Sequence, residues 1–176
     1  MENQPGQPLP DYIQPGLKTL FVGFNPSIRS GEVGHHFASP NNRFWKILHE
    51  AGLTPRKYRP TEDATLLELG YGLTNIVARP TRAATDVEAA EYAQGTKLLI
   101  QKVELNLPRV VCFVGKGVYQ IYAHQRQADW GFQTRETVPG VVDFIAPSSS
   151  GLVRMNMAEI VAIYGFLSMY LRDSRR

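Results

Sequence analysis

The sequence has a single cysteine, Cys112, and no apolar run long enough to cross a bilayer. One cysteine excludes an internal disulfide and leaves no cysteine-based zinc framework. A membrane span needs about 20 consecutive apolar residues, so we expect no membrane segment. The N-terminal residues also lack a charged region followed by an apolar one, so we expect no signal peptide and a cytoplasmic location. Cys112 lies within VVCFVG and is expected to be an inert core thiol.

Several common catalytic signatures are missing as well. The Gly-Lys of VGKGVY lacks the spacing of a Walker phosphate loop, and GFNPSI does not match the GxGxxG fingerprint. The serines of PSSSG form no GxSxG elbow, and no histidine follows them. His35 and His36 are adjacent, and adjacent side chains of an extended segment point in opposite directions. They make a poor joint metal site, so we expect structural or surface roles for them. No metal or cofactor is expected.

Charge is not concentrated in either sign. Charged residues make up 20% of the 176 residues, the net charge is +3 and the pI is about 9.1. This mild basic excess permits a polyanionic partner without requiring one. Length and a hydrophobic content of 43% are ordinary for one globular domain, expected at residues 17–176. Residues 1–16 carry four prolines and are expected to be a poorly ordered arm.

Apolar runs that alternate with helical patterns predict an α/β fold. Strands are expected at 18–24, 72–77, 109–115 and 141–146, with an extended edge segment at 130–138. Helices are expected at 62–69, 87–106, 116–123 and 156–172, and also between an N-cap at Asn42 and a stop at Gly52. The pattern predicts a three-layer α/β/α sandwich around a central, mostly parallel four-stranded sheet. Ligands bind beyond the carboxyl ends of such strands, where the loops 25–41 and 147–154 are expected.

The first of these loops has little acid–base chemistry but offers a rigid amide. Pro26 follows Asn25 directly and restricts the backbone after the strand. An amide is no general base near neutral pH, but it accepts a hydrogen bond from a water and aims that water at an electrophilic carbon. Such a site suits a reaction with a good leaving group and a cationic transition state. Hydrolysis of an N-glycosidic bond to uracil is such a reaction.

Two long motifs resemble those of a known family. VGFNPSIRSGEVGHHFASPNNRFWKIL and PSSSGLVR are similar to the motifs of the mismatch-specific uracil/thymine DNA glycosylases, within the uracil-DNA glycosylase superfamily. The resemblance extends over nearly the whole chain from about residue 16 and includes QPGLKTLFVGFNP, GLTNIVARPT, VCFVGK and ADWG. It implies the uracil-DNA glycosylase-like form of the predicted sandwich.

The resemblance also implies roles for individual residues. Asn25 matches the asparagine that positions the attacking water, and Phe37 matches the aromatic residue that stacks on the flipped base. The backbone amides of Phe24 and Phe37 would bind the uracil carbonyl edge. Leu152 takes the position of the wedge that fills the gap left by the extruded nucleotide, which offsets part of the cost of flipping. Residues of the second loop expected to contact DNA are Ser149, Ser150, Gly151 and Arg154, and Ser148 is expected near the base.

Three departures from the family pattern concern the choice of base. Ser27 stands where bacterial members carry glycine, and Asn75 where some carry lysine. The second motif reads SSSG, closer to the eukaryotic thymine glycosylases than to the bacterial NPSG form. Both Ser27 and Asn75 are expected near the base and would shift the balance among uracil, thymine and other lesions. Arg43 is expected to support a helix start or pair locally, with a phosphate contact as the alternative.

The leading hypothesis is a monofunctional DNA glycosylase of base excision repair. It would excise uracil, and also thymine or ethenocytosine, opposite guanine and leave an abasic site. Neither motif holds a lysine for a Schiff base, so no strand cleavage is expected. The expected partner is double-stranded DNA bound by a monomer. Two alternatives stay open: a non-catalytic module that binds mismatched DNA, and an unrelated α/β hydrolase of small nucleosides.

Overall fold

The computed structural model describes residues 6–173, and its core is a five-stranded sheet. The strands are β1 (Thr19–Gly23), β2 (Tyr71–Asn75), β3 (Val110–Val114), β4 (Gly131–Phe132) and β5 (Val142–Ala146), in the order β2-β1-β3-β5-β4. The first three strands and β5 are parallel, and β4 is antiparallel to β5. The predicted mostly parallel α/β sheet is therefore confirmed, but the expected count of four strands is wrong by one.

The additional strand β4 lies within the expected edge segment 130–138. Gly131 and Phe132 pair with β5, and the ring of Phe132 packs against Phe144 of that strand, with ring centroids 4.7 Å apart. Gln133 then donates its backbone N–H to the Asp143 carbonyl at 2.9 Å. A two-residue pairing of this kind has too short a pattern to be recognised in a sequence.

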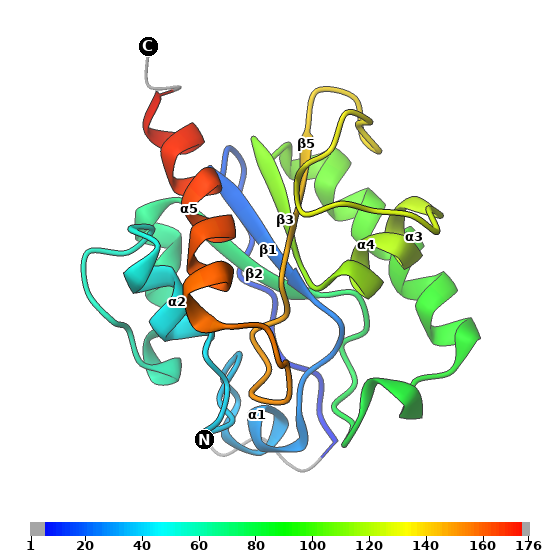
Figure 1. Cartoon of the computed structure of the whole chain (residues 1–176). Helices are drawn as coiled ribbons and strands as arrows, with labels where there is room; N and C mark the ends of the chain where they lie inside the picture. Colours follow the sequence, from blue (N-terminus) through cyan, green and yellow to red (C-terminus); the bar gives the residue numbers. More distant parts are fainter. Residues whose placement is uncertain (1–5, 174–176) are drawn as a thin grey trace.

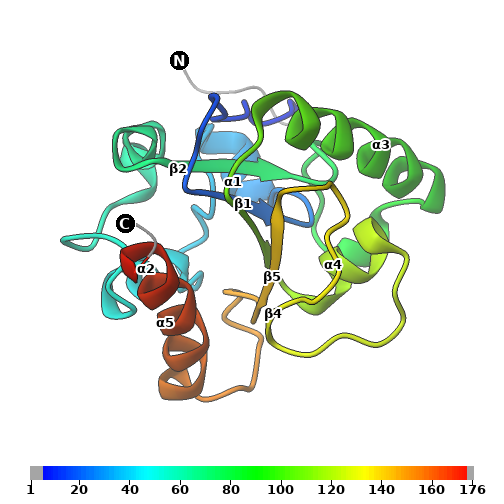
Figure 2. The same ribbon diagram turned by 90° about the horizontal axis from the view of Figure 1, so that it is seen from above.

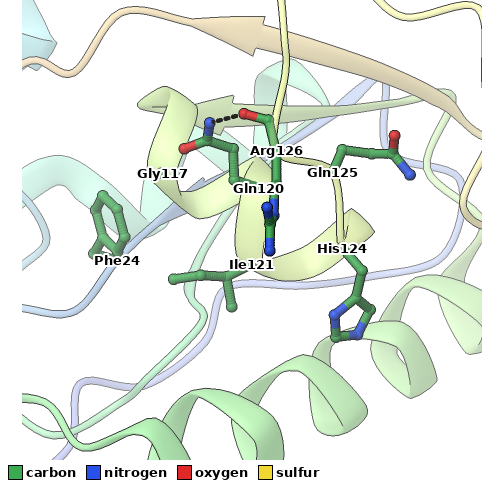
Figure 3. A pocket seen from close by; sticks show the side chains of 7 residues that line it. All are labelled: Phe24, Gly117, Gln120, Ile121, His124, Gln125 and Arg126. Atoms are coloured by element: carbon green, nitrogen blue, oxygen red, sulfur yellow. Dashed lines mark hydrogen bonds between the residues drawn. The ribbon is translucent and has the colours of Figure 1, made fainter.

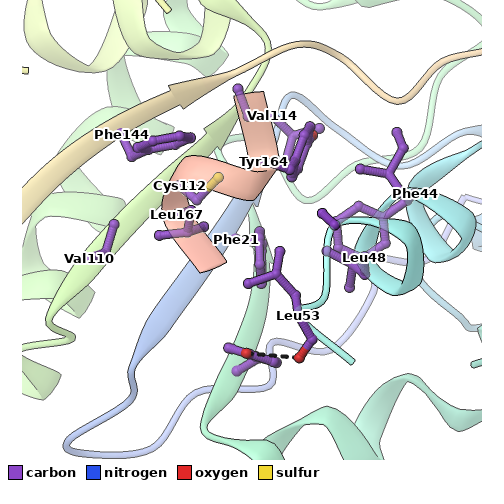
Figure 4. Packing of buried hydrophobic residues seen from close by; sticks show 14 of the residues in the cluster. Phe21, Phe44, Leu48, Leu53, Val110, Cys112, Val114, Phe144, Tyr164 and Leu167 are labelled. Carbon is purple, nitrogen blue, oxygen red and sulfur yellow. Dashed lines mark hydrogen bonds between the residues drawn. The ribbon is translucent and has the colours of Figure 1, made fainter. Parts of the chain in front are cut away.

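Helices cover both faces of the sheet (Figures 1 and 2). The helices α2 (Phe44–Glu50) and α5 (Met157–Asp173) lie on one face, and α3 (Ala89–Asn106) and α4 (Lys116–Ala123) lie on the other. Strand side chains alternate between the two faces. Phe21, Cys112 and Phe144 pack under α2 and α5 (Figure 4), whereas Val22, Val111 and Ile145 pack under α3 and α4. This burial on both faces explains why the strands are mostly apolar, with polar exceptions such as Thr74 on β2 and Asp143 on β5.

The remaining elements are short. They are α1 (Ile28–Val33) and two 3-10 helices, η1 (Pro60–Leu69) and η2 (Ala84–Asp86). The segment 62–69, expected as a helix, therefore lies within η1. The N-cap of α2 is Arg43 and not Asn42 as expected, although the Asn42 Oδ1 accepts the Phe44 N–H at 3.0 Å just before the helix. The short α1 was not expected within the first motif. Its N-cap is Ser27, whose hydroxyl accepts the Ser30 N–H.

Residues 9–12 of the expected disordered arm pack on the domain. Leu9 is buried, Tyr12 pairs with Leu73 beside β2, and Asp11 accepts a hydrogen bond from the Thr74 hydroxyl at 2.6 Å. These contacts give the segment a fixed place that its proline-rich composition did not indicate. Residues 1–5 of the same predicted arm lie outside the described residues.

One buried carboxyl group lies within the sheet, on β5. Asp143 on β5 is fully buried, and its Oδ2 accepts hydrogen bonds from the backbone N–H and the hydroxyl of Thr137. Its Oδ1 has no partner among the described residues. Burial is the main cause that raises the pKa of Asp143 to about 6. The folded protein therefore binds this proton more tightly than the unfolded chain does.

Replacing Asp143 by asparagine is expected to stabilise the protein at neutral pH. The wild-type free energy of unfolding falls as pH rises from the ordinary pKa of 3.8 towards about 6, because the folded state holds the extra proton in that window. Asparagine keeps an acceptor for Thr137 without the charge, so we expect a gain on the order of 1–3 kcal/mol at pH 7.5 and little at pH 4. Urea unfolding at both pH values measures this, and an equal effect at both would contradict it.

Candidate functional site

A cavity of about 690 Å³ lies beyond the carboxyl ends of the parallel strands. Its walls come from the loops after β1 and β5, which meet at one end of the sheet (Figure 1). The loop after β2 and buried Leu9 complete it. The structure brings ten of the eleven predicted site residues to this cavity: Phe24, Asn25, Ser27, Phe37, Asn75, Ser148, Ser149, Ser150, Gly151 and Leu152. Arg154 is exposed and does not line it.

The side-chain amide of Asn25 has one defined orientation. Its Nδ2 donates to the Arg79 carbonyl at 3.0 Å and to the Thr81 hydroxyl oxygen at 2.7 Å. The Thr81 hydroxyl donates its own hydrogen to the Ala83 carbonyl at 2.7 Å, so towards Asn25 it acts as an acceptor. Both amide hydrogens are thereby used. No described residue donates to Oδ1, which is left as an acceptor for a water or a substrate.

Phe37 provides a planar wall held by several contacts. Its ring stacks on Phe44, with centroids 4.0 Å apart and an angle of 20° between the planes. Its backbone φ of 50° lies in the left-handed region, which is unfavourable for a side chain of this size. The Trp45 indole N–H donates to the Phe37 carbonyl at 3.2 Å and holds this conformation. The backbone N–H groups of Phe24 and Phe37 have no acceptor among the described residues.

Asp63 on η1 anchors the residues just before Phe37. Its carboxylate accepts the His36 backbone N–H at 2.8 Å and lies 3.1 Å from Nδ1 of His35. The His36 ring is buried, and burial lowers the pKa of His36, so the ring is neutral near pH 7. Its Nε2 therefore donates to the Pro10 carbonyl at 2.8 Å. The two histidines have structural roles, as the sequence indicated.

Ser27 lines the cavity, but its hydroxyl is fully engaged by the protein. It accepts hydrogen bonds from the Ser30 N–H at 3.1 Å and from the Ser39 hydroxyl at 2.9 Å, and it donates to Ser30 Oγ at 3.1 Å. A hydroxyl group has one donor and two acceptor sites, so none is left for a base. In this conformation the Ser27 hydroxyl therefore has no free donor or acceptor site for the expected contact with the base.

Asn75 lies on the floor of the cavity beside Phe37. A Cβ atom placed on Gly23 would lie only 2.6 Å from Asn75 Oδ1 and 3.6 Å from the Phe37 ring. The amide of Asn75 therefore occupies the space above Gly23, and a side chain at position 23 would displace it. No hydrogen bond from a described residue engages this amide. Asn75 thus presents a donor and an acceptor at the cavity floor.

The second loop forms a tight turn with an apolar tip. Ser148 Oγ accepts the Ser150 N–H at 3.3 Å, and Ser150 Oγ accepts the Leu152 N–H at 3.2 Å. Leu152 projects from this turn with 93% of its surface exposed, at the rim of the cavity. Ser149 is only 1% exposed, so its hydroxyl is closed to solvent in the free protein, and its expected phosphate contact stays a prediction.

A sequence comparison identifies the family. The sequence model of the uracil DNA glycosylase superfamily matches residues 10–166. The chain belongs to this superfamily. A solved structure with the same fold is that of a protein from Methanosarcina acetivorans provisionally named as a uracil DNA glycosylase. The two chains are 19% identical with a TM-score of 0.55, over 93% of this chain and 98% of the other.

Membership of the uracil DNA glycosylase superfamily indicates which class of reaction the chain belongs to. The superfamily consists of hydrolases that act on DNA in base excision repair. Within residues 6–173, no group of three or more histidine, cysteine, aspartate or glutamate side chains is arranged to hold a metal ion. In the same part of the chain, no helix has the length and apolarity to cross a membrane.

This superfamily member has a second cavity, of about 580 Å³, between α4 and the chain that follows it (Figure 3). Gly117, Ile121, His124 and Arg126 line it, and the Phe24 ring closes one end. A Cβ atom on Gly117 would lie 2.4 Å from the Phe24 ring, so that ring is packed firmly onto α4. Asn25 and the serine loop are absent from its walls. The first cavity is therefore the candidate active site.

Three residues that form or support the candidate site were not predicted from the sequence: Thr81, Asp63 and Leu9. Each acts through a contact between segments far apart in the chain. Asn25 and Thr81 are 56 positions apart, and His36 and Asp63 are 27 apart. The sequence offered one signal, the threonine of ARPT within GLTNIVARPT, which belongs to the stretch of family resemblance.

Proposed function

We propose that this chain is a monofunctional DNA glycosylase that hydrolyses the N-glycosidic bond of uracil mispaired with guanine. Thymine and ethenocytosine opposite guanine are the further candidate bases. The reaction releases the free base and leaves an abasic site in double-stranded DNA. The orientation of the Asn25 amide carries this proposal: both of its hydrogens are bound by Arg79 and Thr81, and its oxygen is left for a water.

Hydrolysis begins with a water that donates a hydrogen bond to Asn25 Oδ1. That contact holds a lone pair of the water towards C1′ of the sugar. The water is therefore already ordered before the glycosidic bond breaks, which lowers the entropic part of the barrier. As the glycosidic bond lengthens, the sugar gains positive charge and uracil leaves with its electron pair as a stabilised anion. The water adds to C1′ and then loses a proton to solvent. Positioning replaces a strong base because the leaving group departs readily.

The leaving base is held by Phe37 and by backbone donors. One face of the Phe37 ring is occupied by Phe44, so the base stacks at the other face. The unpartnered N–H groups of Phe24 and Phe37 donate to a carbonyl oxygen of uracil. They stabilise the negative charge that develops on that oxygen as the bond breaks. Asn75 pairs with the polar edge of the base at the cavity floor.

Access to the cavity requires the nucleotide to rotate out of the duplex. Flipping costs a few kcal/mol, and a G·U or G·T mismatch costs less than a Watson–Crick pair. Leu152 inserts into the space that the nucleotide leaves and restores apolar contact with the neighbouring bases. Arg154 and the exposed part of the serine turn lie beside it and contact the opposite strand or its phosphates.

The proposed enzyme stops at the abasic site. Strand cleavage by a bifunctional glycosylase requires an amine that attacks C1′. No lysine is among the residues that line the cavity. We therefore propose water as the sole nucleophile, with no cofactor. The product strand should stay intact until it is treated with alkali, and chelators should leave the rate unchanged.

Replacing Thr81 by valine is expected to slow base release about tenfold without weakening DNA binding. Valine has nearly the shape of threonine but lacks the hydroxyl that accepts from Asn25. The backbone bond from Thr81 N–H to the Pro26 carbonyl at 3.1 Å keeps the segment in place. Single-turnover kinetics measure the rate, and Thr81→Ser should restore it. Thr65→Val is the control, because Thr65 is an exposed threonine on η1. A normal rate for Thr81→Val would contradict this role.

A substrate panel tests the proposed specificity. Labelled duplexes carrying G·U, G·T, A·U or G·ethenocytosine, and single-stranded uracil, are incubated with excess protein and then treated with alkali. We expect the fastest release from G·U and no turnover of free deoxyuridine. Equal rates on G·U and A·U would overturn the mismatch preference. Tight binding to G·U with no release of any base would support a non-catalytic binding module instead.

A further inference from the structure

Arg43 ties the turn that carries Leu152 to the start of α2. Its backbone N–H donates to the Ser149 carbonyl at 2.9 Å. Its guanidinium Nη2 donates to the carbonyls of Ser150 and Val153, at 3.1 and 3.2 Å. These three acceptors lie on both sides of Leu152. Arg43 is partly buried, and its Nη2 bonds within the protein to carbonyls on both sides of the tip of the turn.

The loop after β5 also makes a close backbone contact with the loop that precedes α2. A Cβ atom on Gly151 would lie 2.7 Å from the Asn41 carbonyl oxygen, so only glycine fits at this contact. The residue after Arg43 is Phe44, whose ring stacks on Phe37. Arg43 and Phe44 are adjacent, so the start of α2 supports both the turn that carries Leu152 and the ring of Phe37.

The environment of Arg43 shows that its position is set by the turn. Its Nε atom is buried and has no hydrogen-bond partner among the described residues. Leaving a charged donor group without a partner is costly, and the bonds to Ser150 and Val153 offset that cost. Surface turns are more mobile than the helices and strands they connect, and the bonds from Arg43 restrain this one from within the protein.

We propose that Arg43 is a positioning residue that couples insertion of Leu152 to capture of the flipped base at Phe37. The inference rests on the proposed function. Leu152 stabilises the flipped state only if the turn that carries it keeps its position when the bases press on it. The guanidinium group of Arg43 holds that turn through the two bonds from its Nη2. Arg43 touches neither DNA nor the base in this role. Its contribution therefore requires the Leu152 side chain.

The test is a double-mutant cycle. Arg43→Met keeps the length of the stem and removes the donors, and it is made with Leu152 and with Leu152→Ala. Single-turnover release from G·U is measured beside the fluorescence of a 2-aminopurine next to the uracil, which reports flipping. We expect Arg43→Met to lower the rate and the fluorescence change about tenfold in the wild-type background, and less than twofold with Leu152→Ala. Equal losses in both backgrounds would overturn the coupling.

Two further variants separate this role from a phosphate contact. Arg43→Lys keeps the charge but loses the planar fork, so we expect it to stay nearly as slow as Arg43→Met. Full recovery in Arg43→Lys, with a salt dependence altered only in Arg43→Met, would mean a phosphate contact and would contradict the proposal. Lys46→Met, an exposed cation on α2, is the matched control and should keep the wild-type rate.

Hydrogen exchange on the free protein tests the role of Arg43 independently of the proposed glycosylase activity. Arg43→Met and Arg43→Lys should speed exchange at residues 149–153 and leave the sheet unchanged. If the wild-type protein releases no base but exchange at 149–153 is faster in the variants, the proposed function is wrong. The role of Arg43 in holding the turn would still be supported. If exchange at 149–153 is unchanged in both variants, Arg43 does not hold the turn, whatever the activity.

Discussion

Replacing Asn25 by alanine is expected to lower uracil release from a G·U duplex by about a thousandfold or more, with little change in fold or DNA affinity. The two hydrogen bonds donated by Asn25 Nδ2 fix the orientation of the amide and leave its oxygen as an acceptor at the cavity. Without it the water loses its alignment with C1′. The contacts of Phe37 and Leu152 with the base and the duplex are unaffected, so binding survives.

Single-turnover kinetics with excess protein measure this loss, and binding to a duplex with an abasic analogue measures affinity separately. Asn106→Ala is the matched control, because Asn106 ends α3 and its amide bonds only to the Lys102 carbonyl within that helix. We expect the control to keep the wild-type rate. A rate for Asn25→Ala within tenfold of the wild type would mean that another group aims the water.

Truncating Leu152 to alanine should slow release from the duplex about 10- to 100-fold and leave single-stranded uracil nearly unaffected. Leu152 is 93% exposed, so nothing in the free protein depends on its side chain. Leu152 acts when the flipped nucleotide leaves a gap in the duplex, where it offsets part of the unstacking cost of a few kcal/mol. Without its side chain that part of the cost is no longer offset. Single-stranded DNA has no paired stack to restore, so the defect should vanish there.

The comparison of the two substrates separates wedging from a general defect. Leu105→Ala removes another leucine, 81% exposed near the end of α3, and serves as the control on both substrates. An equal slowing of Leu152→Ala on duplex and single strand would show that Leu152 supports the turn or the chemistry. A normal rate on the duplex would remove Leu152 from the mechanism.

The fold was largely predictable because each principal strand is buried on both faces. Four apolar runs marked the parallel strands to within about two residues. The fifth strand escaped because Phe132 joins it through tertiary packing on Phe144, not through a pattern of its own. The arm around Leu9 was mistaken for disorder for the same reason: a few long-range contacts outweighed its composition.

The residues that line the candidate site could be predicted from the sequence, whereas the contacts between them could not. Asn25, Phe37 and Leu152 lie in long motifs, and the structure brings all three to one cavity. Ser27 shows the limit, since its neighbours in space use up the hydroxyl that the sequence offered to a base. Ser149 shows it too, because burial is a property of the folded turn. Arg43 pairs with a loop more than a hundred positions away.

The most direct test of the central claim is the mass of the DNA strand after incubation of the purified protein with a G·U duplex. The account predicts that the uracil strand loses uracil and gains water, that free uracil appears in equal amount, and that the strand stays uncut. Asn25→Ala should leave the strand intact over the same time. An unchanged mass with the wild-type protein in excess, or a strand cut without alkali, would contradict the account.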